Sequence, residues 1–301
     1  MPLTEFICPD GEKIPIGNCL VSCRMNHRCL TLPTLMQIIT GDRPWDGTPS
    51  TTRLLNGTMQ EWLKATKPYA AKPQNYAYAL LGNEHHAKLE RAAGGVTTVT
   101  SETRIGTTIR STPDILEPDE IFPGCFVITD YKTFGSYRVM KILGLEKHEG
   151  FSDTEVYKSS GKWGKAGSPK RITTWVVNPT KVDMYQEQMQ LNHYRLQLSD
   201  QGYPITRMQL QITVRDGNTQ SARGRGITEP IYLVPIPTLD DQWLRDFFEE
   251  KRRMLVAAMS GEQKPPVCND QESWEGRRCQ DFCDVAHHCS KGQIEQAKKK
   301  R

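Results

Sequence analysis

Apolar and polar side chains alternate along several segments of the chain, most regularly from Arg207 to Arg215. A period of two predicts a half-buried β-strand, because successive side chains of a strand point to opposite faces of the sheet. Residues 96–116 are rich in Thr, Val and Ile, which predicts two strands joined by a turn near Gly106. Further strands are expected over residues 125–132, 137–143, 172–177 and 231–236. The polar, Gly-rich stretch from Glu146 to Lys170 predicts a flexible loop.

Other segments have apolar residues three and four positions apart, which predicts amphipathic helices. We expect such helices after a cap at Ser50 or Thr51 and over residues 239–259, and further helices from Tyr76 to Gly94 and after a cap at Asp183. A shorter helix falls within residues 30–50. This succession of elements predicts an α/β (α+β) fold, in which a central mixed sheet of four to five strands is flanked by helices.

Composition restricts the class of protein. The 301 residues are enough for one large or two modest domains, and the formal net charge is +4. No apolar run approaches the roughly 18 residues of a membrane span, and no secretory leader is visible, so we expect a cytoplasmic protein without membrane contact. Lysines gather between residues 147 and 171, and the chain ends Lys298-Lys299-Lys300-Arg301. Such clusters are suited to binding a polyanion, and they are equally typical of a solvated loop and a disordered tail.

Eight of the nine cysteines form two groups with the same spacing, C-x10-C-x3-C-x5-C. The first group is Cys8, Cys19, Cys23 and Cys29, and the second is Cys268, Cys279, Cys283 and Cys289. Four thiols per group, in a chain without a visible export signal, favour metal binding over disulfides. Zn²⁺ and a 4Fe-4S cluster both take four thiolates, and the spacing does not decide between them. Reduced thiols without a ligand are the remaining alternative.

Candidate catalytic residues lie between Ser111 and Thr133. Asp114 follows Pro113, and Asp130 and Lys132 fall in the strand expected over residues 125–132. Two carboxylates and a lysine near strand ends are suited to metal-dependent cleavage of a phosphodiester. An Asp after Pro is more often a turn residue, and an Asp and a Lys two apart often face solvent together.

Two of the expected helices carry polar residues on one face. Gly82 and His86 are at positions i and i+4, so the small residue would let another segment approach while His86 points into a site. His85 faces elsewhere on the same helix. A polar stripe facing solvent is the alternative for these residues. On the helix after Asp183, Gln190 and Tyr194 are also i, i+4 neighbours.

In order along the chain, these motifs resemble those of the PD-(D/E)XK nuclease superfamily, in its RecB-type branch. They are Gly82-x3-His86, Pro113-Asp114, Asp130-Tyr131-Lys132-Thr133 and Gln190-x3-Tyr194, and the Asp-Tyr-Lys-Thr tetrapeptide matches letter for letter. Cysteines on both sides further resemble the iron–sulfur members of the branch, the CRISPR-associated and phage exonucleases. The resemblance covers about residues 50–289 and implies a restriction-endonuclease-like core.

The resemblance also implies a function: a metal-dependent DNA nuclease in a bacterial or phage-infected cytoplasm. Such a protein is expected to be an exonuclease on single-stranded DNA or DNA ends, in recombination, repair or phage DNA processing. The implied ligands of Mg²⁺ or Mn²⁺ are His86, Asp114, Asp130 and the backbone carbonyl of Tyr131. Lys132 would orient or help deprotonate the attacking water, and Gln190 and Tyr194 would position the scissile strand. Aromatics such as Trp163 could stack on bases of a single strand.

The cysteines depart from the iron–sulfur members, in which one upstream cysteine joins three downstream ones. Each end of this chain has a complete group, which favours two self-contained structural metal sites. The expected organisation is an N-terminal four-cysteine module over residues 1–45, a nuclease core over 46–260, and a C-terminal four-cysteine module with a basic tail over 261–301.

Two other functions stay open. One is a catalytically silent DNA-binding or adaptor protein with the same fold, against which the intact Asp, Asp and Lys set argues. The other is a zinc-organised interaction protein in which the motif matches are accidental. Metal-dependent cleavage of DNA would separate a nuclease from both.

Overall fold

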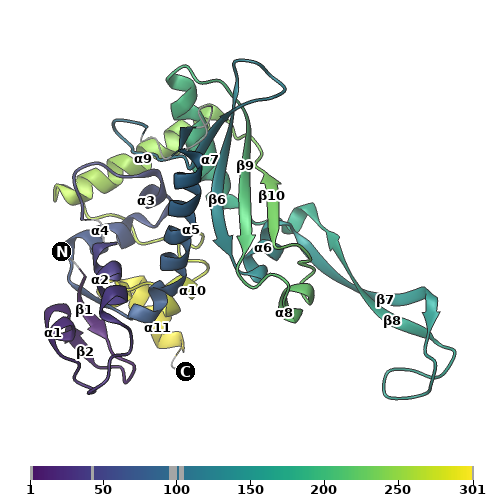
Figure 1. The fold of residues 1–301 in the computed structure, drawn as a ribbon. Helices are drawn as coiled ribbons and strands as arrows, with labels where there is room; N and C mark the ends of the chain where they lie inside the picture. The colour runs from purple at the N-terminus through teal and green to yellow at the C-terminus, as the bar shows by residue number, and fades with distance from the viewer. Residues whose placement is uncertain (1–2, 42–43, 95–99, 102–104, 300–301) are drawn as a thin grey trace.

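A mixed five-stranded sheet is the centre of the computed structural model, which describes residues 3–41, 44–94, 100–101 and 105–299 (Figure 1). The strand order is β10-β9-β6-β5-β4, with β6 and β9 parallel and the other neighbours antiparallel. The strands are β4 (Thr100–Ser101), β5 (Ile115–Pro118), β6 (Phe126–Phe134), β9 (Ile205–Val214) and β10 (Ile231–Pro235). The mixed α/β architecture expected from the sequence is therefore confirmed. Most of the segment expected to form two strands over residues 96–116 lies outside the described residues or in irregular structure.

Opposite faces of this sheet are covered by two helices, α5 (Ala77–Ala93) and α7 (Tyr185–Asp200). The inward residues of β9 are those that the alternation predicts, and all are buried: Met208, Leu210, Ile212 and Val214. They share a core with Leu191 and Leu198 of α7. On β6, Thr133 alternates with the residues facing α7, and it lies against α5, where a Cβ added at Gly82 would stand 3.3 Å from Thr133 Oγ1. Gly82 thus permits the close approach that the sequence suggests.

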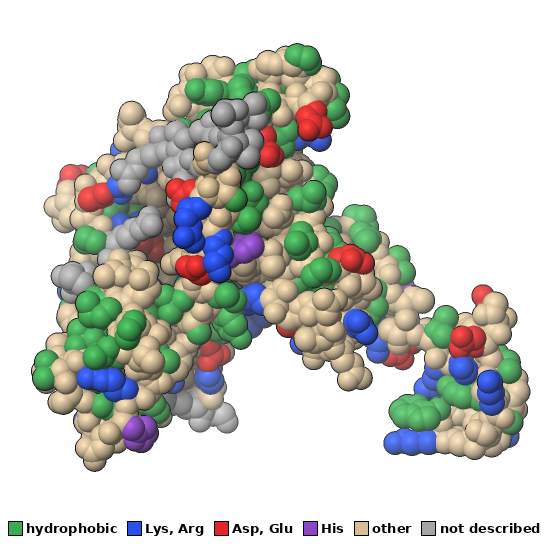
Figure 2. Space-filling view, viewed as in Figure 1, with side chains coloured by type: hydrophobic (Ala, Val, Ile, Leu, Met, Phe, Trp, Pro, Cys, Tyr) green, Lys and Arg blue, Asp and Glu red, His purple; other side chains and the backbone are tan. Residues whose placement is uncertain are grey.

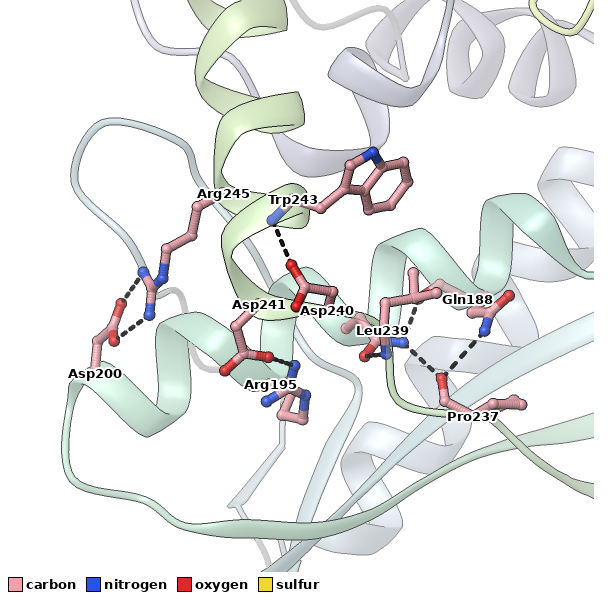
Figure 3. A network of polar contacts seen from close by, with 10 residues as sticks. Gln188, Arg195, Asp200, Pro237, Leu239, Asp240, Asp241, Trp243 and Arg245 are labelled. Atoms are coloured by element: carbon pink, nitrogen blue, oxygen red, sulfur yellow. Dashed lines mark hydrogen bonds and ion pairs between the residues drawn. The ribbon is translucent and has the colours of Figure 1, made fainter.

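A polar network joins α7 to the start of α9 (Asp241–Met259), as Figure 3 shows. Asn192 donates to the carbonyl of Pro237 at 2.9 Å and accepts from the backbone N–H of Leu239 at 2.9 Å. Asp240 caps α9 by accepting from the N–H of Trp243 at 2.8 Å. Because Asn192 is fully buried, these bonds satisfy polar groups that would otherwise cost free energy and thereby fix α9 against α7.

The two ends of the chain lie together, beside the helical part of the molecule (Figure 1). Leu3, Phe6 and Val285 belong to one buried cluster, against which Cys19 and Cys268 also pack. The elements here are β1 (Leu3–Ile7), β2 (Lys13–Pro15), α1 (Ile16–Val21), α2 (Leu32–Thr40), α3 (Thr51–Leu55), α4 (Thr58–Thr66), β3 (Tyr69–Ala71), η1 (Pro73–Tyr76), α10 (Arg277–Asp281), η3 (Ala286–His288) and α11 (Ser290–Lys299). Strands β2, β1 and β3 form a small sheet that the sequence did not indicate. No helix in the described ranges has the length and apolar composition to cross a membrane.

The helix expected after Ser50 is two helices, α3 and α4. Ser50 does cap the first, accepting from the N–H of Arg53. The chain bends at Asn56 and Gly57 because the second cysteine group approaches there: a Cβ at Gly57 would lie 2.2 Å from Cys268 Sγ. The sequence alone could not show a contact between residues so distant along the chain.

The strand expected over residues 137–143 is wrong, because this segment is the helix α6 (Ser136–Ile142). Val139 and Ile142, three positions apart, are both buried in the main core. The carboxylate of Asp216 accepts from the backbone N–H and the hydroxyl of Ser136, at 2.6 Å each. A negative charge at a helix N-terminus is stabilising, so a residue 80 positions away supports a helix that the local pattern hid.

The flexible loop expected from Glu146 to Lys170 is also wrong. Two long antiparallel strands, β7 (Leu145–Val156) and β8 (Pro169–Val177), form a ribbon that leaves the body of the protein (Figure 1). The strand expected over residues 172–177 is part of β8. The expected cap at Asp183 is absent, since Asp183 instead pairs with Arg138 at 3.0 Å. Two short elements complete the chain, η2 (Pro179–Lys181) and α8 (Gln220–Arg223).

His193 connects several of these elements from the interior of the protein. Its ring stacks on Phe248 of α9 with 3.9 Å between centroids, and its Nδ1 lies 2.8 Å from Thr51 Oγ1. Thr51 Oγ1 in turn lies 2.6 Å from the hydroxyl of Ser111. Burial, with a smaller contribution from Arg245, lowers the pKa of His193 from 6.5 to about 3. The neutral imidazole is therefore the form that the fold accommodates.

This pKa predicts a loss of stability in mild acid. Because the pKa is lower in the folded than in the unfolded chain, the contribution of His193 is complete above pH 6.5 and is lost as the pH falls toward 3. Between pH 6.5 and 5 the loss is about 2 kcal/mol. Urea unfolding at pH 7 and pH 5 should show this extra loss in the parent protein and not in His193→Gln. The exposed His148, changed to Gln, is the matched control, and an equal pH response in the His193 variant would contradict the prediction.

Candidate active site

Asp130 and Lys132 form a buried ion pair on β6. Both side chains point to the α7 face, and Asp130 Oδ2 lies 2.5 Å from Lys132 Nζ. Asp130 is 1% exposed, and the lysine ammonium beside its Oδ2 is its main electrostatic partner. Burial raises the pKa of Asp130 to about 6, against the lowering effect of Lys132. Burial lowers the pKa of Lys132, but the attraction of Asp130 outweighs it and the net shift is upward.

Asp114 reaches this pair from the start of β5. The ladder between β5 and β6 ends at Ile115 and Thr129, so the next residues of β6 have no strand partner on that side. Asp114 Oδ2 accepts from the backbone N–H of Tyr131 at 2.7 Å and so replaces the missing strand. This bond explains why a carboxylate directly before β5 faces the site instead of serving as a turn residue in solvent.

His86, on α5, contacts the other carboxylate oxygen of Asp114. Its Nδ1 lies 3.5 Å from Asp114 Oδ1, and its ring meets that of Tyr131 edge to face, with 6.3 Å between centroids. The hydrogen bond to Asp114 raises the pKa of His86, and burial opposes this shift. His85, which the helical spacing set aside, is also beside the site: its Nε2 lies 3.3 Å from Thr213 Oγ1 and its ring is 6.4 Å from that of Tyr131. The sequence feature that could have indicated His85 is its position beside His86, on the same helix as Gly82.

Gln190 and Tyr194 of α7 complete the site above Asp130. Gln190 Nε2 donates to Asp130 Oδ1 at 3.2 Å and to Tyr194 Oη at 2.8 Å. Burial, followed by the charge of Asp130, raises the pKa of Tyr194, so the phenol stays protonated. Gln190 thus orients the carboxylate of Asp130, and Tyr194 in turn orients the amide of Gln190.

A second ion pair beside the site is not apparent from the sequence. Glu187, one turn before Gln190, accepts from Arg138 Nη2 at 2.6 and 2.9 Å. Glu187 is buried, and its charge contributes to the raised pKa of Lys132. The sequence feature that could have indicated Glu187 is its position three residues before Gln190, which places both on one face of the helix.

The side chains expected from the sequence are thus close neighbours. Asp130 is electrostatically coupled to Lys132, Asp114 and His86. Within the described residues, however, no group of three or more His, Cys, Asp or Glu side chains is arranged to hold a metal ion. Two carboxylates and an imidazole are a donor set that Mg²⁺ and Mn²⁺ accept, so the chemistry of the residues suits a divalent ion.

All nine cysteines are thiols without a disulfide. Those of the first group line one small cavity of about 20 Å³ together: Cys8, Cys19, Cys23 and Cys29. In the second group, burial raises the pKa of Cys268 and of Cys283 to about 11 each, and Cys279 is close enough to contribute to both shifts. Four soft sulfur donors per group suit Zn²⁺ or an iron–sulfur cluster, which would displace the thiol protons on binding.

Comparisons with known proteins give no assignment. No protein family matches the sequence, and no curated protein matches it. Among solved structures, the chain is similar to the crystal structure of SSO0001, with a TM-score of 0.41 and 15% identity over 85% of this chain and 93% of that one. It is also similar to a chain named "Putative exonuclease" from Eubacterium rectale, with a TM-score of 0.28 and 13% identity over 68% of this chain and 58% of that one. Because these scores are low, any function has to be argued from the site.

The cysteine groups generate a prediction about metal content. If each group is self-contained, Cys23→Ser should remove the metal of the first group alone, and Cys279→Ser that of the second alone. Elemental analysis and visible absorption of anaerobically purified protein measure this. A brown protein indicates iron–sulfur clusters, and a colourless one with about two zinc ions per chain indicates zinc.

Cys125→Ser is the control, since Cys125 belongs to neither group, and its metal content should equal that of the parent. Loss of all metal from either single variant would show one shared site. A parent protein without bound metal would contradict the prediction.

Proposed function

We propose that this chain is a metal-dependent deoxyribonuclease that hydrolyses phosphodiester bonds. The observation that supports it is the buried carboxylate of Asp130, held between Lys132 and Gln190 and coupled to Asp114 and His86. A buried carboxylate with a raised pKa, next to a second carboxylate, is costly for stability and is typical of active sites. A solvated polar surface would not need such an arrangement.

The proposed ligands of Mg²⁺ or Mn²⁺ are His86, Asp114, Asp130 and the backbone carbonyl of Tyr131. A bound ion would lower the pKa of a coordinated water and neutralise charge on the phosphate. Lys132, which pairs with Asp130, would orient or help deprotonate the attacking water and stabilise the negative charge that develops at the phosphate. Gln190, which donates to Asp130 Oδ1, would keep that carboxylate in position, and Gln190 and Tyr194 would together position the scissile strand.

The substrate in this proposal is DNA, cut as a single strand or from an end. The support is chemical: the site combines acidic residues with an adjacent lysine, and further basic residues are clustered elsewhere on the chain. A catalytically silent or zinc-organised binding protein is the alternative that the experiment below must exclude.

Cleavage of end-labelled single- and double-stranded DNA, with Mg²⁺, Mn²⁺ or EDTA, tests the proposal. The parent should cut with either ion and not with EDTA. Asp114→Ala, Asp130→Ala and Lys132→Ala should each lower the rate by about 10²-fold or more, because each removes a charged group that acts on the reacting phosphate or its metal.

The control is Asp200→Ala, an exposed carboxylate ten residues along α7 from Gln190. Ten helical residues span about 15 Å, so this variant should cut like the parent. Release of mononucleotides from one labelled end would identify an exonuclease. Absence of metal-dependent cleavage, or full activity in the Asp114 and Lys132 variants, would sink the proposal.

A further inference from the structure

The ribbon of β7 and β8, here called the arm, projects away from the rest of the protein. Figure 1 shows it leaving the body beside β10, and Figure 2 shows its outer part as a separate mass with lysines and arginines on its surface. Its β7 strand has 12 residues, which at roughly 3.3 Å per residue gives a reach of roughly 40 Å. An isolated two-stranded ribbon is marginally stable in water, so its persistence in a fold calls for a function.

The root of the arm is fixed to the body. Trp175 packs against Gly226, where an added Cβ would lie 2.5 Å from the indole Cγ. Asn178 donates its backbone N–H to the carbonyl of Gly144 at 2.8 Å and its side-chain amide to Glu146 Oε2 at 2.7 Å. The arm is therefore aimed in a defined direction by contacts at its base.

The tip of the arm, residues 157–168, is ordered by its own hydrogen bonds. Tyr157 exchanges backbone bonds with Ser168 and Gly167 at 2.9 and 2.8 Å, and Gly161 exchanges two with Gly164. Its glycines permit close packing: a Cβ at Gly164 would lie 2.4 Å from Tyr157 Cε2. The tip is therefore an ordered structure, and its lysines Lys158, Lys162 and Lys165 are exposed.

The charged residues of the tip and of the strand that follows it are all basic. No Asp or Glu occurs from residue 156 to residue 182. The basic residues of the tip are Lys158, Lys162 and Lys165, and those after it are Lys170, Arg171 and Lys181. Lys170 pairs with Glu155 at 3.0 Å, but within the described chain Lys158, Lys165 and Arg171 make no ion pair. Trp163 is 71% exposed, with Lys162 Nζ 5.4 Å from its ring. Several cations with no carboxylate partner, on a projecting support, match an extended polyanion.

We propose that the arm binds duplex DNA next to the strand that the active site cuts, an inference that rests on the proposed nuclease function. Duplex is favoured over a single strand for two reasons. A two-stranded ribbon has the width that the major groove admits. A reach of roughly 40 Å also spans about one turn of B-DNA, so the tip meets phosphates one turn from the body. Lys158 and Lys165 neutralise these phosphates, and the protein thereby selects DNA in which a duplex adjoins the end being cut.

Binding of the full-length protein to a 20-base-pair duplex, measured in EDTA at several salt concentrations, tests this inference. Each lysine that neutralises a phosphate contributes about 1 to the slope of log K against log salt. The double variant Lys158→Ala/Lys165→Ala should therefore reduce the slope by about 2 and weaken binding at low salt by at least tenfold. The matched control is Lys147→Ala/Lys170→Ala, which removes the same charge from the same arm at lysines already paired with Glu149 and Glu155. This control should keep the parental slope.

Cleavage of a single strand, binding to single-stranded DNA and gel filtration separate the outcomes. Cleavage of a short single-stranded oligonucleotide should be equal in the tip variant and the parent, because the active site is unchanged. If the parent cuts no DNA but the tip variant loses duplex affinity, the nuclease proposal fails and the arm's role in binding stands. An unchanged slope in the tip variant, equal losses on single-stranded and duplex DNA, or a changed oligomeric state on gel filtration would each overturn the inference.

Discussion

The parallel pairing of β6 with β9 is the constraint on which the remaining structure depends. Parallel neighbours cannot be joined by a tight turn, so the chain between Phe134 and Ile205 must cross over the sheet. That connection supplies α6, the arm and α7 in succession. It also lays α7 across the face where Asp130 and Lys132 stand, opposite Leu210 and Ile212. One pairing thus places both the candidate active site and the surface proposed to bind DNA.

The candidate site is a balance of buried charges. Desolvation alone would neutralise Asp130, and the ammonium of Lys132 limits this effect without abolishing it, which leaves the pKa near 6. Glu187 and Arg138 form a second pair beside the first, so the neighbouring charges compensate one another. Because β5 is short, the N–H of Tyr131 has no strand partner on that side and donates to Asp114 instead. This bond brings the second carboxylate close to Asp130. Such a cluster is maintained by the surrounding core, in which Ile128 and Leu210 are fully buried.

The terminal segments raise a different physical problem. Each is too short to bury a core of its own, and the structure brings them together in one cluster that includes Leu3, Phe6 and Val285. Cys268 and Cys283 lie half-buried against this cluster, where burial raises the pKa of each thiol to about 11 and so opposes its ionisation at neutral pH. A bound metal would offset that cost and hold both ends against the body, as structural metals do in small modules.

The sequence by itself determined the features that repeat over a few residues. The alternation in β9 and the buried face of α9 follow from local periods of burial and polarity, and the order of Gly82, His86, Asp130 and Gln190 is read directly from the chain. Only the tertiary structure decided that residues 136–142 are helical, because Asp216 supports their N-terminus and the main core receives Val139. It also decided that a Gly-rich basic segment is an arm, since cross-strand partners are distant in sequence. Contacts between distant residues depend on how the whole chain closes, and no local pattern records them.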